Sequence, residues 1–65
     1  MKSNKLSPTE KEAEVIRLLK MGYENTEIAE AMGISKRTVE AYFHKLYTKY
    51  RVSSKLKLLK ELELL

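Results

Sequence analysis

Apolar side chains recur every three or four residues along most of this chain, and no segment alternates apolar and polar residues with a period of two. The clearest case is the segment 36–50, in which Val39, Phe43, Leu46 and Tyr50 follow this spacing. Spacing of three and four places side chains on one face of an α-helix, whereas half-buried strands need a period of two. The pattern therefore predicts an all-α fold without strands.

The length and the residue types restrict how such helices are held together. The chain has 65 residues, which is near the lower limit for a domain stabilised by a single apolar core. It has no cysteine and one histidine, His44, so it has neither a disulfide nor the ligands for a zinc site. We find no apolar run that could span a membrane and no signal-peptide pattern. We therefore expect a cytoplasmic protein without a metal, another cofactor or a small-molecule ligand.

The first helix is marked at both ends. We expect Ser7 to be its N-cap, with Pro8 at the first helical position and Glu10 completing a capping box three residues after the serine. Gly22 stands where a left-handed residue commonly ends a helix. Residues 1–5 before this helix are expected to form a flexible arm, and residues 6–65 a single domain.

Two further helices follow, and three residues join them. The first of these covers residues 25–32 and is ended by Gly33, and the second covers about 36–50 and is capped by Ser35. Two helices joined by a short turn that contains glycine form the helix-turn-helix pattern. A last helix is expected to begin from Ser53 or Ser54, which makes a bundle of four.

Charge is distributed unevenly along the chain. Residues 8–34 contain three cations and six carboxylates, whereas residues 35–51 have a net charge of +4. The charged residues of the second segment are Lys36, Arg37, Lys45, Lys49 and Arg51, with Glu40 as the one carboxylate. A basic run is most often a plain solvated face, but an acidic part followed by a basic helix is also typical of a domain that faces a polyanion.

A helical wheel of the segment 36–50 separates its apolar stripe from a polar face. The side chains directly opposite the stripe are those of Arg37, Ala41, His44 and Thr48, with Glu40 beside them. The other shoulder of the helix carries Thr38, Tyr42, Lys45 and Lys49. The polar side therefore combines cations with small and hydrogen-bonding groups, which is what recognition of a duplex requires.

Several short motifs follow one another along the chain in an order that is typical of a known family. They are LSPTEKE at the start of the first helix, NTEIAEAMGIS across the turn, TV at 38 and 39, Lys49, and VSS before the last helix. In this order and at these spacings the chain resembles the LuxR/FixJ/NarL-type helix-turn-helix DNA-binding domain over roughly residues 6–62. It departs from that pattern at Glu24, where serine or threonine is usual, and at Arg51, where glycine or asparagine is common.

The resemblance implies a bacterial transcription regulator that binds double-stranded DNA as a homodimer. It implies a tetrahelical bundle with the third helix in the major groove and the fourth as the dimerisation helix. Many members carry an N-terminal receiver or ligand-binding domain, whereas the GerE-like members consist of this domain alone. The chain is therefore either a short natural protein of the second kind, which the opening methionine and the polar KSN favour, or a domain cut from a longer protein.

From the helical wheel and the chemistry of the side chains we assign roles to residues in DNA binding and in dimerisation. Base edges are expected to be read by Arg37, Glu40, Ala41 and His44. The expected phosphate contacts are Asn25, Thr26, Lys36, Thr38, Tyr42, Lys45 and Lys49. The tail has too many leucines for one stripe, so we expect a dimer contact through Leu56, Leu59 and Leu62.

Other functions remain open at this point. No carboxylate pair has a nucleophile or base beside it, so an enzyme is the class with least support. A module like sigma region four would share the helix-turn-helix and dock on RNA polymerase, which is a candidate partner in any case, but the VSSK segment before a leucine-rich helix disfavours it. A short antagonist that forms a heterodimer with a full-length regulator is the other alternative.

Overall fold

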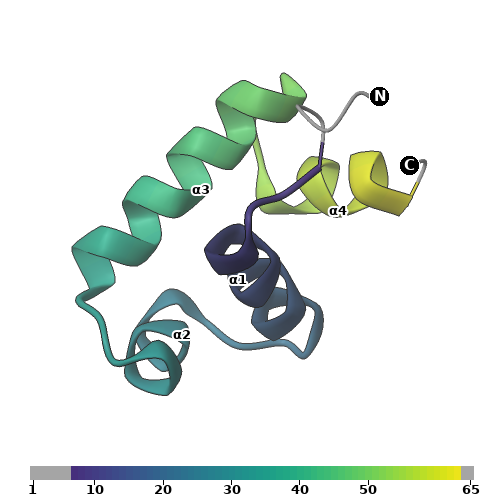
Figure 1. Ribbon diagram of the computed structural model, residues 1–65. Coiled ribbons are helices and arrows are strands. Elements are labelled where there is room, and N and C mark those ends of the chain that lie inside the picture. Colours follow the sequence, from purple (N-terminus) through teal and green to yellow (C-terminus); the bar gives the residue numbers. More distant parts are fainter. Residues whose placement is uncertain (1–6, 64–65) are drawn as a thin grey trace.

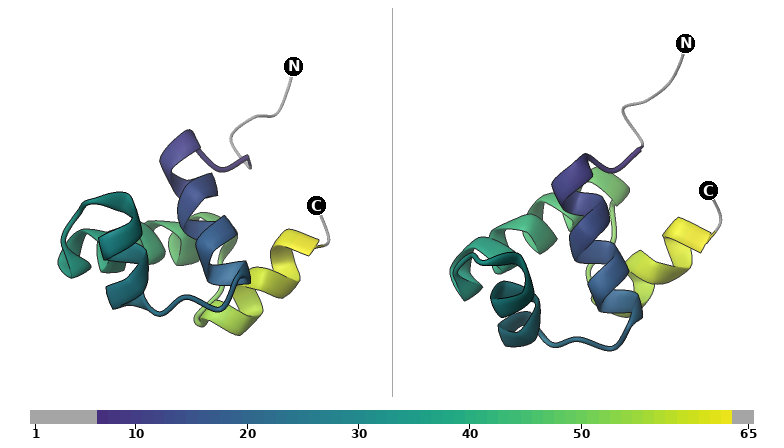
Figure 2. Two further views of the ribbon diagram at one scale, coloured as in Figure 1. Left: turned by 90° about the horizontal axis from the view of Figure 1, so that it is seen from below. Right: turned by 60° about the horizontal axis from the view of Figure 1, so that its bottom comes forward.

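The computed structural model describes residues 7–63, and this part of the chain folds into four α-helices without a strand. The helices are α1 (Glu10–Lys20), α2 (Asn25–Met32), α3 (Lys36–Tyr50) and α4 (Lys55–Glu63). The other three helices lie on one side of α3, the longest of them (Figure 1). In the further views α1 lies between α2 and α4 (Figure 2). The prediction of an all-α bundle of four helices is confirmed, whereas the expected arm 1–5 lies outside the described residues.

One core is built from all four helices. Five of its side chains, Val15, Ile28, Val39, Leu46 and Leu58, are completely buried. Burial of an aliphatic side chain of this size contributes about 1.5–3 kcal/mol, so this cluster is a main source of stability in so small a domain. Because α3 supplies four buried apolar residues, more than any other described helix, the core fixes how α3 is rotated about its own axis.

The structure corrects the predicted start of the first helix. Thr9 is the N-cap, and its hydroxyl accepts a hydrogen bond from the Glu12 amide at 3.2 Å. Glu12 Oε1 in turn accepts from the Thr9 amide at 2.9 Å, which completes a capping box. The sequence contains two overlapping patterns of this kind, and the prediction with Ser7, Pro8 and Glu10 took the wrong one. The capping box that forms uses Glu12, whose side chain is buried. This carboxylate is favoured because it also pairs with Lys49 of α3.

The turn between α2 and α3 has the predicted form. Gly33 ends α2 in the left-handed conformation, with φ 68°, and the Ile34 amide donates to the Ala29 carbonyl at 3.0 Å. Ser35 caps α3 by accepting from the Thr38 amide at 3.0 Å. At the other end of α2 the Glu24 amide donates to Glu27 Oε1 at 2.8 Å, which supports a helix start that lacks serine or threonine.

The joint between α3 and α4 is formed by a residue in an unusual conformation. Arg51 has φ 57° and ψ 48°, which is the left-handed region that glycine occupies most easily. The Lys57 amide donates to Ser54 Oγ at 3.1 Å, so Ser54 rather than Ser53 caps α4. The chain thus turns after α3, and α4 packs against α3.

Candidate nucleic-acid interface

The outer face of α3 is open to solvent over its whole length. Val39, Phe43, Leu46 and Tyr50 are buried, as the helical wheel predicted. The opposite side chains are all exposed, namely those of Arg37, Glu40, Ala41, His44 and Thr48. All five project from the one helix α3, which its buried residues hold against the core. This face could therefore enter the major groove of a DNA duplex without any change in the fold.

The start of α3 is positively charged. Its first turn carries the exposed cations Lys36 and Arg37 and no carboxylate; the first turn of α4 also has lysines and no acid, whereas the first turns of α1 and α2 carry glutamates. The N-terminus of a helix has a partial positive charge, so a cation there is unfavourable by roughly 0.3–1 kcal/mol. An anion bound outside the chain would convert this cost into a favourable interaction.

The shoulder of α3 that was expected to contact phosphates is divided between two environments. Thr38 and Lys45 are exposed, and the Thr38 hydroxyl lies 2.9 Å from Ser35 Oγ at the helix cap. Tyr42 is half-buried and packs against the core through its ring. Lys49 is mostly covered and is directed toward α1 rather than toward solvent.

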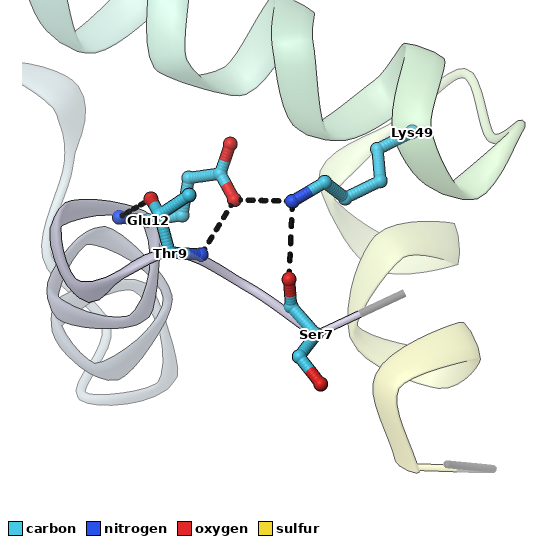
Figure 3. A network of polar contacts seen from close by, with 4 residues as sticks. All are labelled: Ser7, Thr9, Glu12 and Lys49. Carbon is cyan, nitrogen blue, oxygen red and sulfur yellow. Dashed lines mark hydrogen bonds and ion pairs between the residues drawn. The ribbon is translucent and has the colours of Figure 1, made fainter. Parts of the chain in front are cut away.

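Lys49 joins the end of α3 to the start of α1 (Figure 3). Its Nζ lies 2.7 Å from Glu12 Oε1 and donates to the Ser7 carbonyl at 3.1 Å. Burial by itself would raise the pKa of Glu12, but the Lys49 and Thr9 hydrogen bonds and the Lys49 charge outweigh it and lower that pKa. The phosphate role predicted for Lys49 stays a prediction, and the structure adds an internal role for its ammonium group.

The start of α2 carries the two other residues expected to contact phosphates. Thr26 is exposed and Asn25 is half-buried. Asn25 Oδ1 accepts a hydrogen bond from Lys55 Nζ at 2.6 Å, and the same ammonium group lies 4.8 Å from the centroid of the Phe43 ring. The first residue of α4 is thus in contact with both helices of the helix-turn-helix.

The leucines of α4 fall into two groups. Leu58 is completely buried, and Leu62 is half-buried against the core. Leu62 also lines an open groove of about 360 Å³ between α1 and α4, together with Ile16 and Arg17. Leu56, in contrast, exposes 64% of its surface, and Leu59 beside it is half-buried. Of the three residues predicted for a dimer contact, Leu56 faces outward most fully.

Sequence reasoning missed Glu12 and Lys55. Both act through contacts across more than 25 residues of chain, which local patterns do not reveal. One local signal was present for Glu12: it precedes Val15 and Ile16 by three and four residues, and therefore lies on the apolar stripe of α1. A carboxylate in such a position needs a cationic or hydrogen-bonding partner from another element.

No group of three or more histidine, cysteine or acidic side chains within residues 7–63 could hold a metal ion. None of the helices described is long and apolar enough to cross a membrane.

Comparison with known proteins identifies the family. The model for bacterial regulatory proteins of the luxR family matches residues 5–62. A curated relative, described as a probable transcriptional regulator ycf29 of Guillardia theta, is 35% identical over 51 residues. This match covers 78% of the chain and 24% of the relative, so the chain spans about a quarter of that protein's length. No solved structure matches the chain.

The family match covers all four helices, including the glycine-containing turn and the basic third helix. This family consists of regulatory proteins and is not a class of enzymes. The chain therefore belongs to the luxR family of bacterial regulatory proteins, and its four helices form the helix-turn-helix DNA-binding domain of that family.

Proposed function

We propose that this domain binds double-stranded DNA at particular sequences, with α3 in the major groove, and thereby regulates transcription. The proposal rests on the outer face of α3. This face is exposed along the helix, and the first turn of α3 carries two cations and no acidic residue. Of the two helices that begin with cations and no acid, α3 is the one that also presents a whole face of exposed hydrogen-bonding side chains, and this combination supports contact with an external polyanion.

The residues on this face have the chemistry that base recognition needs. The Arg37 guanidinium can donate two hydrogen bonds to the acceptors of guanine, and Glu40 can accept from the amino group of cytosine. Ala41 is small enough to contact a thymine methyl group, and His44 can donate to a purine nitrogen. All four are exposed on one helix, which supports contacts with neighbouring base pairs of one groove.

Phosphate contacts would set the position of α3 without reading the sequence. We assign them to Lys36, Thr38 and Lys45 along α3, with the Tyr42 hydroxyl at the same shoulder. The free amides at the start of α2, with Asn25 and Thr26, would bind a further phosphate, because the N-terminus of a helix attracts anions. Lys49 contributes less, because its charge is already paired with Glu12.

We further propose that the domain binds DNA as a homodimer through α4. Leu56 is one of two large apolar side chains that are strongly exposed among the described residues, and Leu59 extends the same side of the helix. Leu62 would join them only at the edge of the contact, because it already packs against the core. Two copies related by a two-fold axis would favour a partly palindromic site.

The name of the relative supports a role in transcription, since it is described as a probable transcriptional regulator. Selection of bound sequences from a random duplex pool tests the proposal. We expect enrichment of a defined site with related half-sites, and binding that weakens steeply as salt is raised. A pool that stays random would contradict sequence-specific binding.

A further inference from the structure

Lys55 begins α4, but its side chain reaches the first residue of α2. The ammonium nitrogen lies 2.6 Å from Asn25 Oδ1 and 4.8 Å from the centroid of the Phe43 ring. Phe43 is a buried residue of α3, so the cation has a fixed surface beneath it. One side chain of α4 thus contacts both helices of the helix-turn-helix at once.

This contact decides how the Asn25 amide is oriented. An ammonium group can only donate hydrogen bonds, whereas an asparagine side chain has an accepting oxygen and a donating NH₂ group. With Lys55 present, Asn25 must turn its oxygen inward. Without Lys55, the oxygen would be free to accept from the amides in the first turn of α2, as asparagine side chains commonly do.

The NH₂ group of the Asn25 side chain has no hydrogen-bond partner among the described residues. No described residue accepts a hydrogen bond from Asn25 Nδ2, and no buried side-chain nitrogen of the described chain lacks a partner. Nδ2 is therefore accessible to solvent, with its hydrogen atoms directed away from Lys55. It lies at the start of α2, where the partial charge of the helix is positive.

The charge of Lys55 acts in the same direction. Its partners, an amide oxygen and an aromatic ring, are both neutral. In the part of the chain that the structure describes, the lysine paired with a carboxylate is Lys49. Lys55 therefore places a positive charge without a carboxylate partner next to the Asn25 amide, which favours a phosphate oxygen of DNA, while the carboxylates of Glu24 and Glu27 lie at the same start of α2.

We propose that Lys55 is a positioning residue for DNA binding, which orients the Asn25 amide so that Nδ2 donates to a DNA phosphate. The proposal rests on the proposed function and adds a residue outside the helix-turn-helix to it. Asn25 makes the contact, and Lys55 acts through Asn25 without touching the DNA.

A double-mutant cycle tests this role. Binding to a selected and to a random duplex is measured over a series of salt concentrations for wild type, Lys55→Met, Asn25→Ala and the double variant. We expect each single substitution to weaken binding to both duplexes about fivefold, as the loss of one hydrogen bond would. The double variant should bind no more weakly than Asn25→Ala, and Lys55→Arg should bind like wild type.

The salt dependence distinguishes positioning from direct contact. A lysine that itself binds a phosphate would change the salt slope by about one unit when it is removed, and its effect would add to that of Asn25→Ala. That result, or full affinity in Lys55→Met, would overturn the proposal while leaving DNA binding intact. If wild type bound no duplex, the proposed function and this inference would both fail.

A second variant is useful because Lys55→Met could also destabilise the fold. Asn25→Asp keeps an oxygen for Lys55 and so preserves the internal contact, but it removes the NH₂ donor. We expect this variant to be at least as stable as wild type and to bind both duplexes more than about tenfold more weakly, because a carboxylate repels a phosphate. Ala31→Asp, with the same charge at an exposed position near the other end of α2, is the control and should lose much less. Equal losses in the two variants would contradict the assigned contact.

Discussion

The ammonium group of Lys49 lies 2.7 Å from the carboxylate of Glu12, and this contact joins the last turn of α3 to the first turn of α1. The side chains of the two residues expose 22% and 7% of their surface, so the pair is largely removed from water. Glu12 also completes the capping box with Thr9, and Lys49 also binds the Ser7 carbonyl. The same group of atoms therefore fixes the start of α1 and the end of α3.

Glu12→Gln should destabilise the fold. The amide keeps the size of the side chain and an oxygen for the Thr9 amide, but it leaves the Lys49 charge without its anion. We expect the free energy of unfolding to fall by roughly 1.5–3 kcal/mol, the range for a hydrogen bond to a charged group. Chemical denaturation measures this. Glu10→Gln, an exposed glutamate in the same turn, is the control and should lose less than about 1 kcal/mol. Equal losses in the two variants would contradict the role of the pair.

The same pair predicts how stability depends on pH. The pKa of Glu12 is lowered below its usual value of 4.5, so its charged form is favoured by folding. A lowered pKa contributes stability that is complete above 4.5 and is lost as the pH falls through the pKa of the folded state. The difference in stability between wild type and Glu12→Gln should therefore shrink in this acidic range. Denaturation at a series of pH values would show it, and a constant difference would refute it.

Arg51→Gly should stabilise the domain. Arg51 has a left-handed backbone, which costs an ordinary residue roughly 1–2 kcal/mol, and glycine adopts it without strain. Since glycine also gains more entropy on unfolding, we expect a net increase of about 0.5–1 kcal/mol in the free energy of unfolding. Lys57→Gly, at an exposed position in the first turn of α4, is the matched control and should cost up to about 1 kcal/mol. A loss of stability in Arg51→Gly would show that the arginine side chain has a role of its own.

The features of this fold that the sequence predicted depend on interactions between residues close together along the chain, and the features that it missed depend on contacts between distant residues. The stripe of α3 and the stops at Gly33 and Ser35 follow from spacing and from local hydrogen bonds, and they were predicted correctly. The start of α1 was wrong because two capping patterns overlap, and only a contact with α3 decides between Ser7 and Thr9. Such a contact joins residues 37 positions apart, which no periodicity reveals.

The candidate site shows the same division. The exposure of Arg37 and His44 follows from the helical wheel, because residues opposite an apolar stripe face solvent. The partners of lysine side chains do not follow from it, since these chains are long and flexible. Lys45 extends into solvent, whereas Lys49, four residues later, is paired with a carboxylate of another helix.

These two lysines should therefore respond differently to substitution. Lys45→Ala should leave stability unchanged, weaken binding to specific and random duplexes by a similar factor, and reduce the salt slope by about one unit. Lys49→Ala should instead lower the free energy of unfolding, because it leaves Glu12 without its cation. Binding isotherms at several salt concentrations, together with denaturation curves, separate the two effects. Full stability in Lys49→Ala, with a reduced salt slope, would show that its charge serves the DNA instead.

Leu56 is expected to carry much of the dimer contact. Leu56→Glu should leave the fold intact, because the side chain is already 64% exposed, and it should abolish self-association by placing a charge in an apolar contact. Sedimentation over a concentration series, with and without duplex, measures this. Lys57→Glu, at the neighbouring exposed position, is the control. It changes the charge more than Leu56→Glu does, and it should still dimerise. A wild-type protein that stays monomeric, with one copy on each duplex, would rule out the dimer.

The central claim is that the outer face of α3 reads the base sequence, and the most direct measurement is to repeat the selection of bound duplexes with Glu40→Ala and His44→Ala. Each variant should keep its stability, because these side chains point away from the core. Each should lose its preference at particular base pairs, by about 1–3 kcal/mol for a good contact, while Glu30→Ala on α2 selects the wild-type site. Wild-type preferences in both variants would contradict the claim, and unfolding of either would show that this face belongs to the core.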